Sequence, residues 1–135
     1  GSSRADVELR LPAEGAYASV LRTTAAGLAA RLDFTIDDIE DLRMAAGEAH
    51  AMVLAEADDG ADLVCEFFLG ERALTLRMSV AATDPGRPDY ESFGWQVLST
   101  LASEVAAEAD PQRFTVTLTT TSDLSAASDP PPAST

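Results

Sequence analysis

The hydrophobic positions along the chain follow two repeats, one of about two residues and one of about 3.6 residues. Short alternating or apolar runs bounded by turn residues predict four strands, over residues 7–11, 63–69, 74–80 and 114–120. Apolar residues at helical spacing predict three helices, over residues 17–32, 36–54 and 93–105. The predicted order of elements is therefore β-α-α-β-β-α-β.

Local signals support this division of the chain. Thr35 is expected to cap the second helix, with Asp38 at the capping-box position. Gly70-Glu71-Arg72 separates the second and third strands by a spacing that is typical of a β-hairpin. Strands and helices in this order pack as two layers. We therefore expect an α/β (α+β) two-layer sandwich, in which three helices cover one face of a mostly antiparallel mixed sheet.

The length and composition indicate one domain. The 135 residues suffice for a hydrophobic core, and we place the domain at residues 7–121. Residues 1–6 are expected to be a cloning remnant and an N-terminal extension. The tail, residues 122–135, is rich in Ser, Ala, Asp and Pro and is expected to be disordered. The chain shows no apolar run long enough to cross a bilayer and no visible signal peptide, so we expect a cytoplasmic protein.

The charge of the chain restricts its partners. The formal net charge is −14, from 23 acidic residues against nine arginines and no lysine. Such a surface repels phosphates, so we expect no direct binding to DNA or RNA. It favours a basic protein partner, although solubility alone also explains an acidic surface. Cys65, the one cysteine, lies in an apolar strand, where an inert buried thiol is expected.

The second predicted helix carries the candidate chemistry. Glu48 lies within a small, apolar run, and it is either a general base or an ordinary solvated acid. Met52 follows one turn later on the same face. His50 is the one histidine, and no second His, Cys pair or carboxylate cluster stands at ligand spacing from it. We therefore expect a packed helix histidine and no metal site.

Three segments together resemble one family. The helix IDDIEDLRMAAGEAHAMVL is similar to the S-E-A-x-x-N-A helix of the kinase anti-sigma factors (RsbW-like proteins) of the GHKL ATPase superfamily. FGWQVLSTLASEV resembles the family's G-L-G-L-x-x-x-x-x-L-x-D-E-V element, and FTVTLTT resembles its closing strand. The resemblance covers residues 7–120, and it implies the Bergerat ATP-binding fold.

The resemblance also implies roles for individual residues. Glu48 matches the family's activating acid. Arg22 matches the first-helix arginine that contacts the sigma factor and the anti-anti-sigma protein in the family. The match rests on the number of residues between Arg22 and Glu48. Met52 stands where the family has the asparagine that holds magnesium for ATP. A thioether is too soft to replace that oxygen ligand.

The family's adenine-binding motif, D-x-G-x-G, is only partly present. Asp84 and Gly86 match its first two fixed positions, and Pro88 replaces the second glycine. Proline removes a backbone donor and fixes φ. An ordinary turn explains Asp84-Pro85-Gly86 equally well.

The phosphate lid of the family is missing as well. Only residues 85–93 separate Asp84 from Gly94, which matches a family glycine at the start of the third helix. This length is too short for a lid over a triphosphate, and a single glycine limits the approach of backbone to phosphate. Phe93 and Trp95 are expected to crowd the same entrance. These losses argue for weak or absent kinase activity and for no cofactor, with Mg-ATP bound only if the nucleotide site survives.

Three functions follow from the resemblance. In the first, the protein is an anti-sigma factor that sequesters an alternative (stress or developmental) sigma factor and is released by a STAS-type anti-anti-sigma protein. In the second, it is an active Mg-ATP-dependent serine kinase of that antagonist, with Glu48 as base and Asp84 on adenine. In the third, it is a decoy that binds only anti-anti-sigma proteins. A homodimer is expected by the same resemblance.

Overall fold

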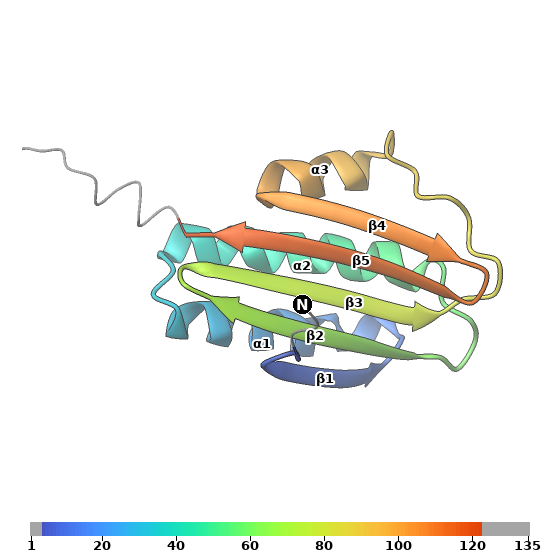
Figure 1. The fold of residues 1–135 in the computed structure, drawn as a ribbon, viewed down its shortest axis with the longest axis horizontal. Helices are drawn as coiled ribbons and strands as arrows, with labels where there is room; N and C mark the ends of the chain where they lie inside the picture. Colours follow the sequence, from blue (N-terminus) through green and yellow to red (C-terminus); the bar gives the residue numbers. More distant parts are fainter. Residues whose placement is uncertain (1–3, 123–135) are drawn as a thin grey trace, which may run out of the picture.

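The computed structural model describes residues 4–122 and contains one sheet with three helices on one of its faces (Figure 1). The strands are β1 Val7–Pro12, β2 Asp62–Gly70, β3 Ala73–Ala81, β4 Glu104–Asp110 and β5 Arg113–Thr121. The helices are α1 Ala18–Arg31, α2 Ile36–Leu54 and α3 Phe93–Leu101, and a short 3-10 turn, η1 Gly15–Tyr17, precedes α1. The predicted two-layer α+β fold is confirmed.

The sheet has the strand order β1-β2-β3-β5-β4, and every pair of neighbours is antiparallel. The predicted hairpin joins β2 to β3, where Gly70 pairs with Ala73. Arg72 lies in the turn with a φ of 56°, a left-handed conformation that occurs in tight turns. The helix-facing side of the sheet is apolar, because alternate residues of each strand point to the same face.

Helix α2 crosses behind the middle of the sheet and has the bounds that its sequence predicted. The Thr35 side chain accepts a hydrogen bond of 3.1 Å from the Asp38 amide, which confirms the N-cap. Its buried side is largely alanine, with Ala45, Ala46 and Ala49 fully buried. Small side chains let helices approach closely, and α1 packs beside α2 through Leu21, Ala25 and Ala29.

The third predicted helix is too long. It ends at Leu101, and residues 104–110 form the edge strand β4 instead, so the order is β-α-α-β-β-α-β-β. Ala102 already has extended dihedral angles, φ −105° and ψ 156°. Val105, the last residue of the predicted helix, belongs to β4, where it pairs with Leu118 of β5 and is half-buried.

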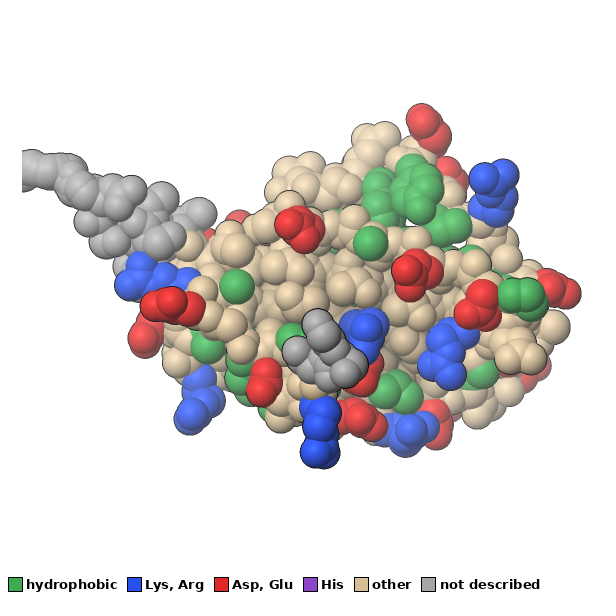
Figure 2. Space-filling view, in the orientation of Figure 1, with side chains coloured by type: hydrophobic (Ala, Val, Ile, Leu, Met, Phe, Trp, Pro, Cys, Tyr) green, Lys and Arg blue, Asp and Glu red, His purple; other side chains and the backbone are tan. Residues whose placement is uncertain are grey.

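The other face of the sheet has no helix over it (Figure 2). It is mostly polar, with acidic and basic side chains scattered across it. Hydroxyl pairs join neighbouring strands, including Thr75 with Thr119 at 2.9 Å and Ser79 with Thr115 at 3.2 Å. Arg77 donates to Glu66 at 2.9 Å on the same face.

The end of β5 is anchored to the helices. Ser122, the first residue of the predicted tail, is buried, and its hydroxyl donates to Asp38 near the start of α2 at 3.1 Å. The rest of the tail, residues 123–135, lies outside the described residues. Between residues 4 and 122, no helix has the length and apolar character that crossing a membrane requires.

Candidate functional site: a cleft across the three helices

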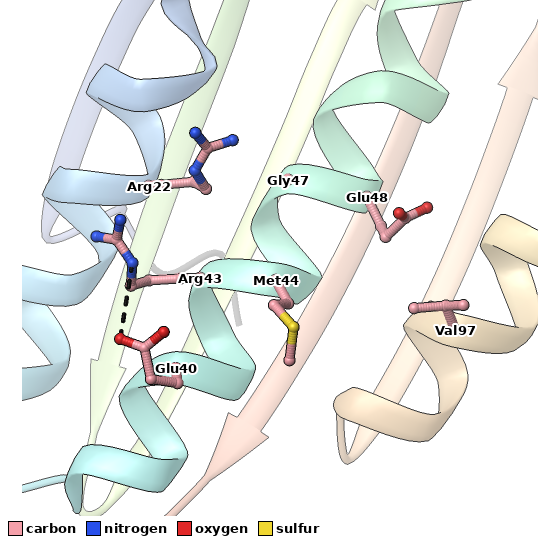
Figure 3. Close-up of a pocket in the computed structure, with 7 residues that line it drawn as sticks. All are labelled: Arg22, Glu40, Arg43, Met44, Gly47, Glu48 and Val97. Carbon is pink, nitrogen blue, oxygen red and sulfur yellow. Dashed lines mark ion pairs between the residues drawn. The ribbon is translucent and has the colours of Figure 1, made fainter.

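The candidate site that contains Glu48 is an open cleft of about 460 Å³ on the outer side of the helical layer (Figure 3). Helix α1 contributes Arg22, and α3 contributes Val97. The α2 residues that line it are Glu40, Arg43, Met44, Gly47 and Glu48. These α2 positions share one face because they follow helical spacing.

Arg22 reaches the cleft across Gly47. A β-carbon at Gly47 would lie 3.5 Å from Arg22 Nη1 and 3.6 Å from Arg22 Cδ, so the arginine side chain lies along the α2 backbone. Within the described part of the chain, Arg22 forms no ion pair and no hydrogen bond. Arg43 has one long ion pair, 4.0 Å from its Nε to Glu40 Oε2. The cleft therefore presents one guanidinium without a charged partner.

Glu48 and Met52 lie directly against the start of α3. A β-carbon at Gly94 would be 3.2 Å from Glu48 Oε1 and 3.8 Å from Met52 Cε. The structure thus brings together the predicted residues Glu48 and Gly94, with Met52 beside them. A side chain at position 94 would require the Glu48 carboxylate to move by a few tenths of an ångström.

These residues do not fit a magnesium–triphosphate group. Mg²⁺ takes oxygen ligands, and the side chain one turn beyond Glu48 is the thioether of Met52. Helix α3 also packs against this face of α2 at Gly94, where phosphate would need room. No three His, Cys, Asp or Glu side chains stand close enough to hold a metal ion anywhere in residues 4–122.

The structure places Asp84 and Gly86 outside the cleft. The Asp84 amide donates to the Pro111 carbonyl at 3.0 Å, beside the turn between β4 and β5. The Gly86 amide donates to Glu56 Oε1 at 3.1 Å. Asp84 has a φ of 46°, which suits a tight turn. Neither residue lines the cleft that holds Glu48.

Phe93, which was expected to crowd the site, is 80% exposed and does not line the cleft. Trp95 does pack inward against the core, and Tyr90 contacts it edge to face at 4.8 Å between ring centroids. The N-cap bond from the Trp95 amide to Ser92 Oγ, 3.1 Å long, fixes the backbone direction at the start of α3 and leaves Phe93 on the solvent side.

His50 is buried with 2% exposure, as expected for a packed histidine, and its Nε2 atom has no hydrogen-bond partner among residues 4–122. Burial lowers its pKa below 6.5, and the positive charge of Arg22 lowers it further. The imidazole is therefore neutral at pH 7. Burial also raises the pKa of the Cys65 thiol to about 12, which agrees with an inert cysteine.

The lowered pKa of His50 predicts a loss of stability in mild acid. His50 of the unfolded state binds a proton near pH 6.5, whereas buried His50 of the folded state binds it only at lower pH. The stability that neutral His50 provides is therefore fully present above pH 6.5 and decreases as the pH falls below 6.5. Between pH 7.5 and 5.5, the free energy of unfolding should fall more in the wild type than in His50→Gln. Urea denaturation at both pH values measures the difference, and parallel losses in the two proteins would contradict it.

Among the cleft residues, the sequence singled out Arg22 and Glu48 but not Glu40, Arg43, Met44, Gly47 and Val97. Arg43 and Met44 precede Gly47 by four and three residues, the spacing that places side chains on one helix face. Val97 of α3 lines the opposite side of the cleft. Their helical spacing from Gly47 was the feature of the sequence that could have predicted Arg43 and Met44 as cleft residues.

The chain is similar to several curated proteins named serine-protein kinase RsbW. It is 37% identical over 89 residues to that of Halalkalibacterium halodurans, covering 64% of this chain and 52% of the relative. It is 34% identical over 82 residues to that of Bacillus cereus (strain B4264), covering 59% of this chain and 49% of the relative. The chain spans about half the length of the curated relatives it matches. No family model matches the chain.

Proposed function

Because the chain is an RsbW-like family member, we propose that it acts as an anti-sigma factor through binding alone. In this proposal it sequesters an alternative sigma factor of the stress or developmental class, and a STAS-type anti-anti-sigma protein releases it. Sigma factors act on RNA polymerase, so the protein would work in the cytoplasm. It would do so without a cofactor and, by analogy with the family, as a homodimer of the 7–121 domain.

One observation carries the proposal: the contact of Glu48 and Met52 with Gly94. Phosphoryl transfer depends on positioning and on neutralising phosphate charge. At this place the chain offers a thioether in place of an oxygen ligand and a packed helix in place of a lid. The family scaffold would thus serve for binding a protein.

Charge supports a protein partner. The net charge of −14 favours a basic surface on the partner and speeds its encounter. Against this background, the unpaired guanidinium of Arg22 in the cleft is suited to a carboxylate on the partner, because an arginine binds carboxylates in a bidentate way. The same residue would contact the sigma factor and the antagonist in turn.

The second candidate function is an active Mg-ATP-dependent serine kinase. Glu48 favours it, since its half-buried carboxylate lines an open cleft and points toward α3 (Figure 3). In that function Glu48 would act as the general base on a serine of the antagonist. The separation of Asp84 from the cleft counts against it, because one ATP molecule would have to reach both regions.

Binding and thermal melting test these functions together. We expect the purified chain to bind a sigma factor from its own genome without nucleotide, and millimolar Mg-ATP to leave its melting temperature unchanged. A nucleotide at 100 times its Kd would instead stabilise the fold by about 2.7 kcal/mol, a rise of several degrees. ADP without magnesium is the matched control for nonspecific effects.

Each alternative gives a different result. A clear rise in melting temperature with Mg-ATP, together with phosphate on a STAS protein, would establish the kinase and contradict binding alone. Binding to STAS proteins with no affinity for any sigma factor of the genome would establish the decoy.

A further inference from the structure

The cleft continues into a second hollow on the outer side of α3. This hollow, about 280 Å³, is lined by Phe93, Gln96, Val97, Thr100 and Leu101. Val97 lines both hollows. The two are therefore parts of one surface that runs from α1, over α2, to α3.

The α3 end of this surface is apolar and exposed. Helix α3 carries no charged residue, although 24% of the chain is charged. Phe93, Val97 and Leu101 lie four residues apart, on one face of the helix. Phe93 is 80% exposed, and Met44, across the cleft on α2, is 52% exposed. Exposed large apolar side chains that gather on one surface mark an interaction site.

The other end of the surface is charged. It contains two arginines and two acids. Glu40 pairs with Arg43 at 4.0 Å, and Glu48, which forms no ion pair among the described residues, points toward α3 and away from Arg22 (Figure 3). Arg22 has no ion-pair partner among the described residues. A ligand for this end needs a carboxylate, while a ligand for the α3 end needs apolar side chains.

We propose that this surface, defined by Arg22, Met44, Phe93, Val97 and Leu101, is a docking groove for an amphipathic helix of the partner protein. The partner helix carries a carboxylate at one end, which Arg22 binds, and apolar side chains at three- and four-residue spacing, which pack between α2 and α3. The groove has helical walls, which suit the ridges of a third helix. The inference rests on the proposed function and adds to it the apolar contact on α3.

The experiment measures the affinity of the full chain for the sigma factor that binds it, using variants of exposed residues. Phe93→Ser and Arg22→Ala should each weaken binding by about tenfold to 100-fold, as expected for anchor residues. Ile36→Ser is the matched control for Phe93, since Ile36 is 79% exposed on α2 and lines neither hollow. Arg10→Ala, on β1 and 60% exposed, is the control for Arg22. Both controls should change the affinity less than twofold.

Each result separates the groove from the proposed function. If Phe93→Ser binds as well as Ile36→Ser while Arg22→Ala binds weakly, the proposed docking groove is wrong, but the proposed sigma-factor binding remains supported. If the wild type binds no sigma factor, both are wrong. Thermal melts of every variant confirm folding, and a second α3 variant, Val97→Ser, replaces Phe93→Ser if that protein fails to fold.

Discussion

Replacing Phe67 with alanine should lower the free energy of unfolding by about 3–5 kcal/mol, the largest stability change expected for this chain. Phe67 is fully buried on the helix-facing side of β2, where it pairs with Val7 of β1 and Leu76 of β3. Truncation removes a whole ring from the centre of the core and leaves a cavity there. Urea denaturation measures the change, and the melting temperature should fall by more than ten degrees.

The next residue provides a matched control. Phe68 points to the open face of the sheet, where the Arg77 guanidinium lies 5.2 Å from the centre of its ring. Phe68→Ala should therefore cost only about 1 kcal/mol, mostly from this cation–π contact. Equal losses at Phe67 and Phe68 would contradict the observed register, because a slip by one residue exchanges the two faces of a strand.

This pair of residues shows how far the sequence predicts the fold. The run LVCEFFL predicts a strand by its apolar character, and the turn at Glu71-Arg72 predicts its partner β3. The sequence of this strand does not indicate whether Phe67 or Phe68 faces the core, because two adjacent phenylalanines interrupt the alternation of apolar and polar residues. Pairing with β1 and β3 decides the question, and that pairing is a property of the folded sheet.

The missed strand has a similar cause. Residues 104–110 read EVAAEAD, and alanine and glutamate favour helices over strands. In the structure Val105 and Ala107 face the core, while Glu104 and Glu108, on either side of them, face outward. Hydrogen bonding to β5 at the edge of the sheet overrides the local preference of these residues. The alternation of Glu104, Val105 and Ala106 was the available signal, but it is short.

The candidate site was predicted in part. The resemblance of α2 singled out Glu48 and Met52, and Gly94 came from a separate motif; the structure places all three in contact. Arg22 reaches the cleft from α1, which the sequence predicted only by resemblance. Val97 and the exposed position of Phe93 depend on how α3 packs against α2, and no local pattern in the sequence contains that information.

Substitution of Gly94 by valine should destabilise the protein by about 2 kcal/mol. A β-carbon alone would stand 3.2 Å from Glu48 Oε1, and valine adds two methyl groups that a stiff χ1 angle cannot turn away. The change should push α3 off α2. Gly27→Val in α1 is the matched control, since no heavy atom lies within 4 Å of a β-carbon there, and its free energy of unfolding should change by less than about 0.5 kcal/mol.

A double-mutant cycle with Glu48→Ala tests the cause. Removing the carboxylate makes room, so Gly94→Val should cost about 1 kcal/mol less in the Glu48→Ala background than in the wild type. Additive losses would mean that α3 does not pack on Glu48. In that case the space beside Met52 would be open to phosphate, and the main reason to prefer binding over phosphoryl transfer would be lost. The same contact therefore links the stability of α3 to the choice between an anti-sigma factor that only binds and a kinase.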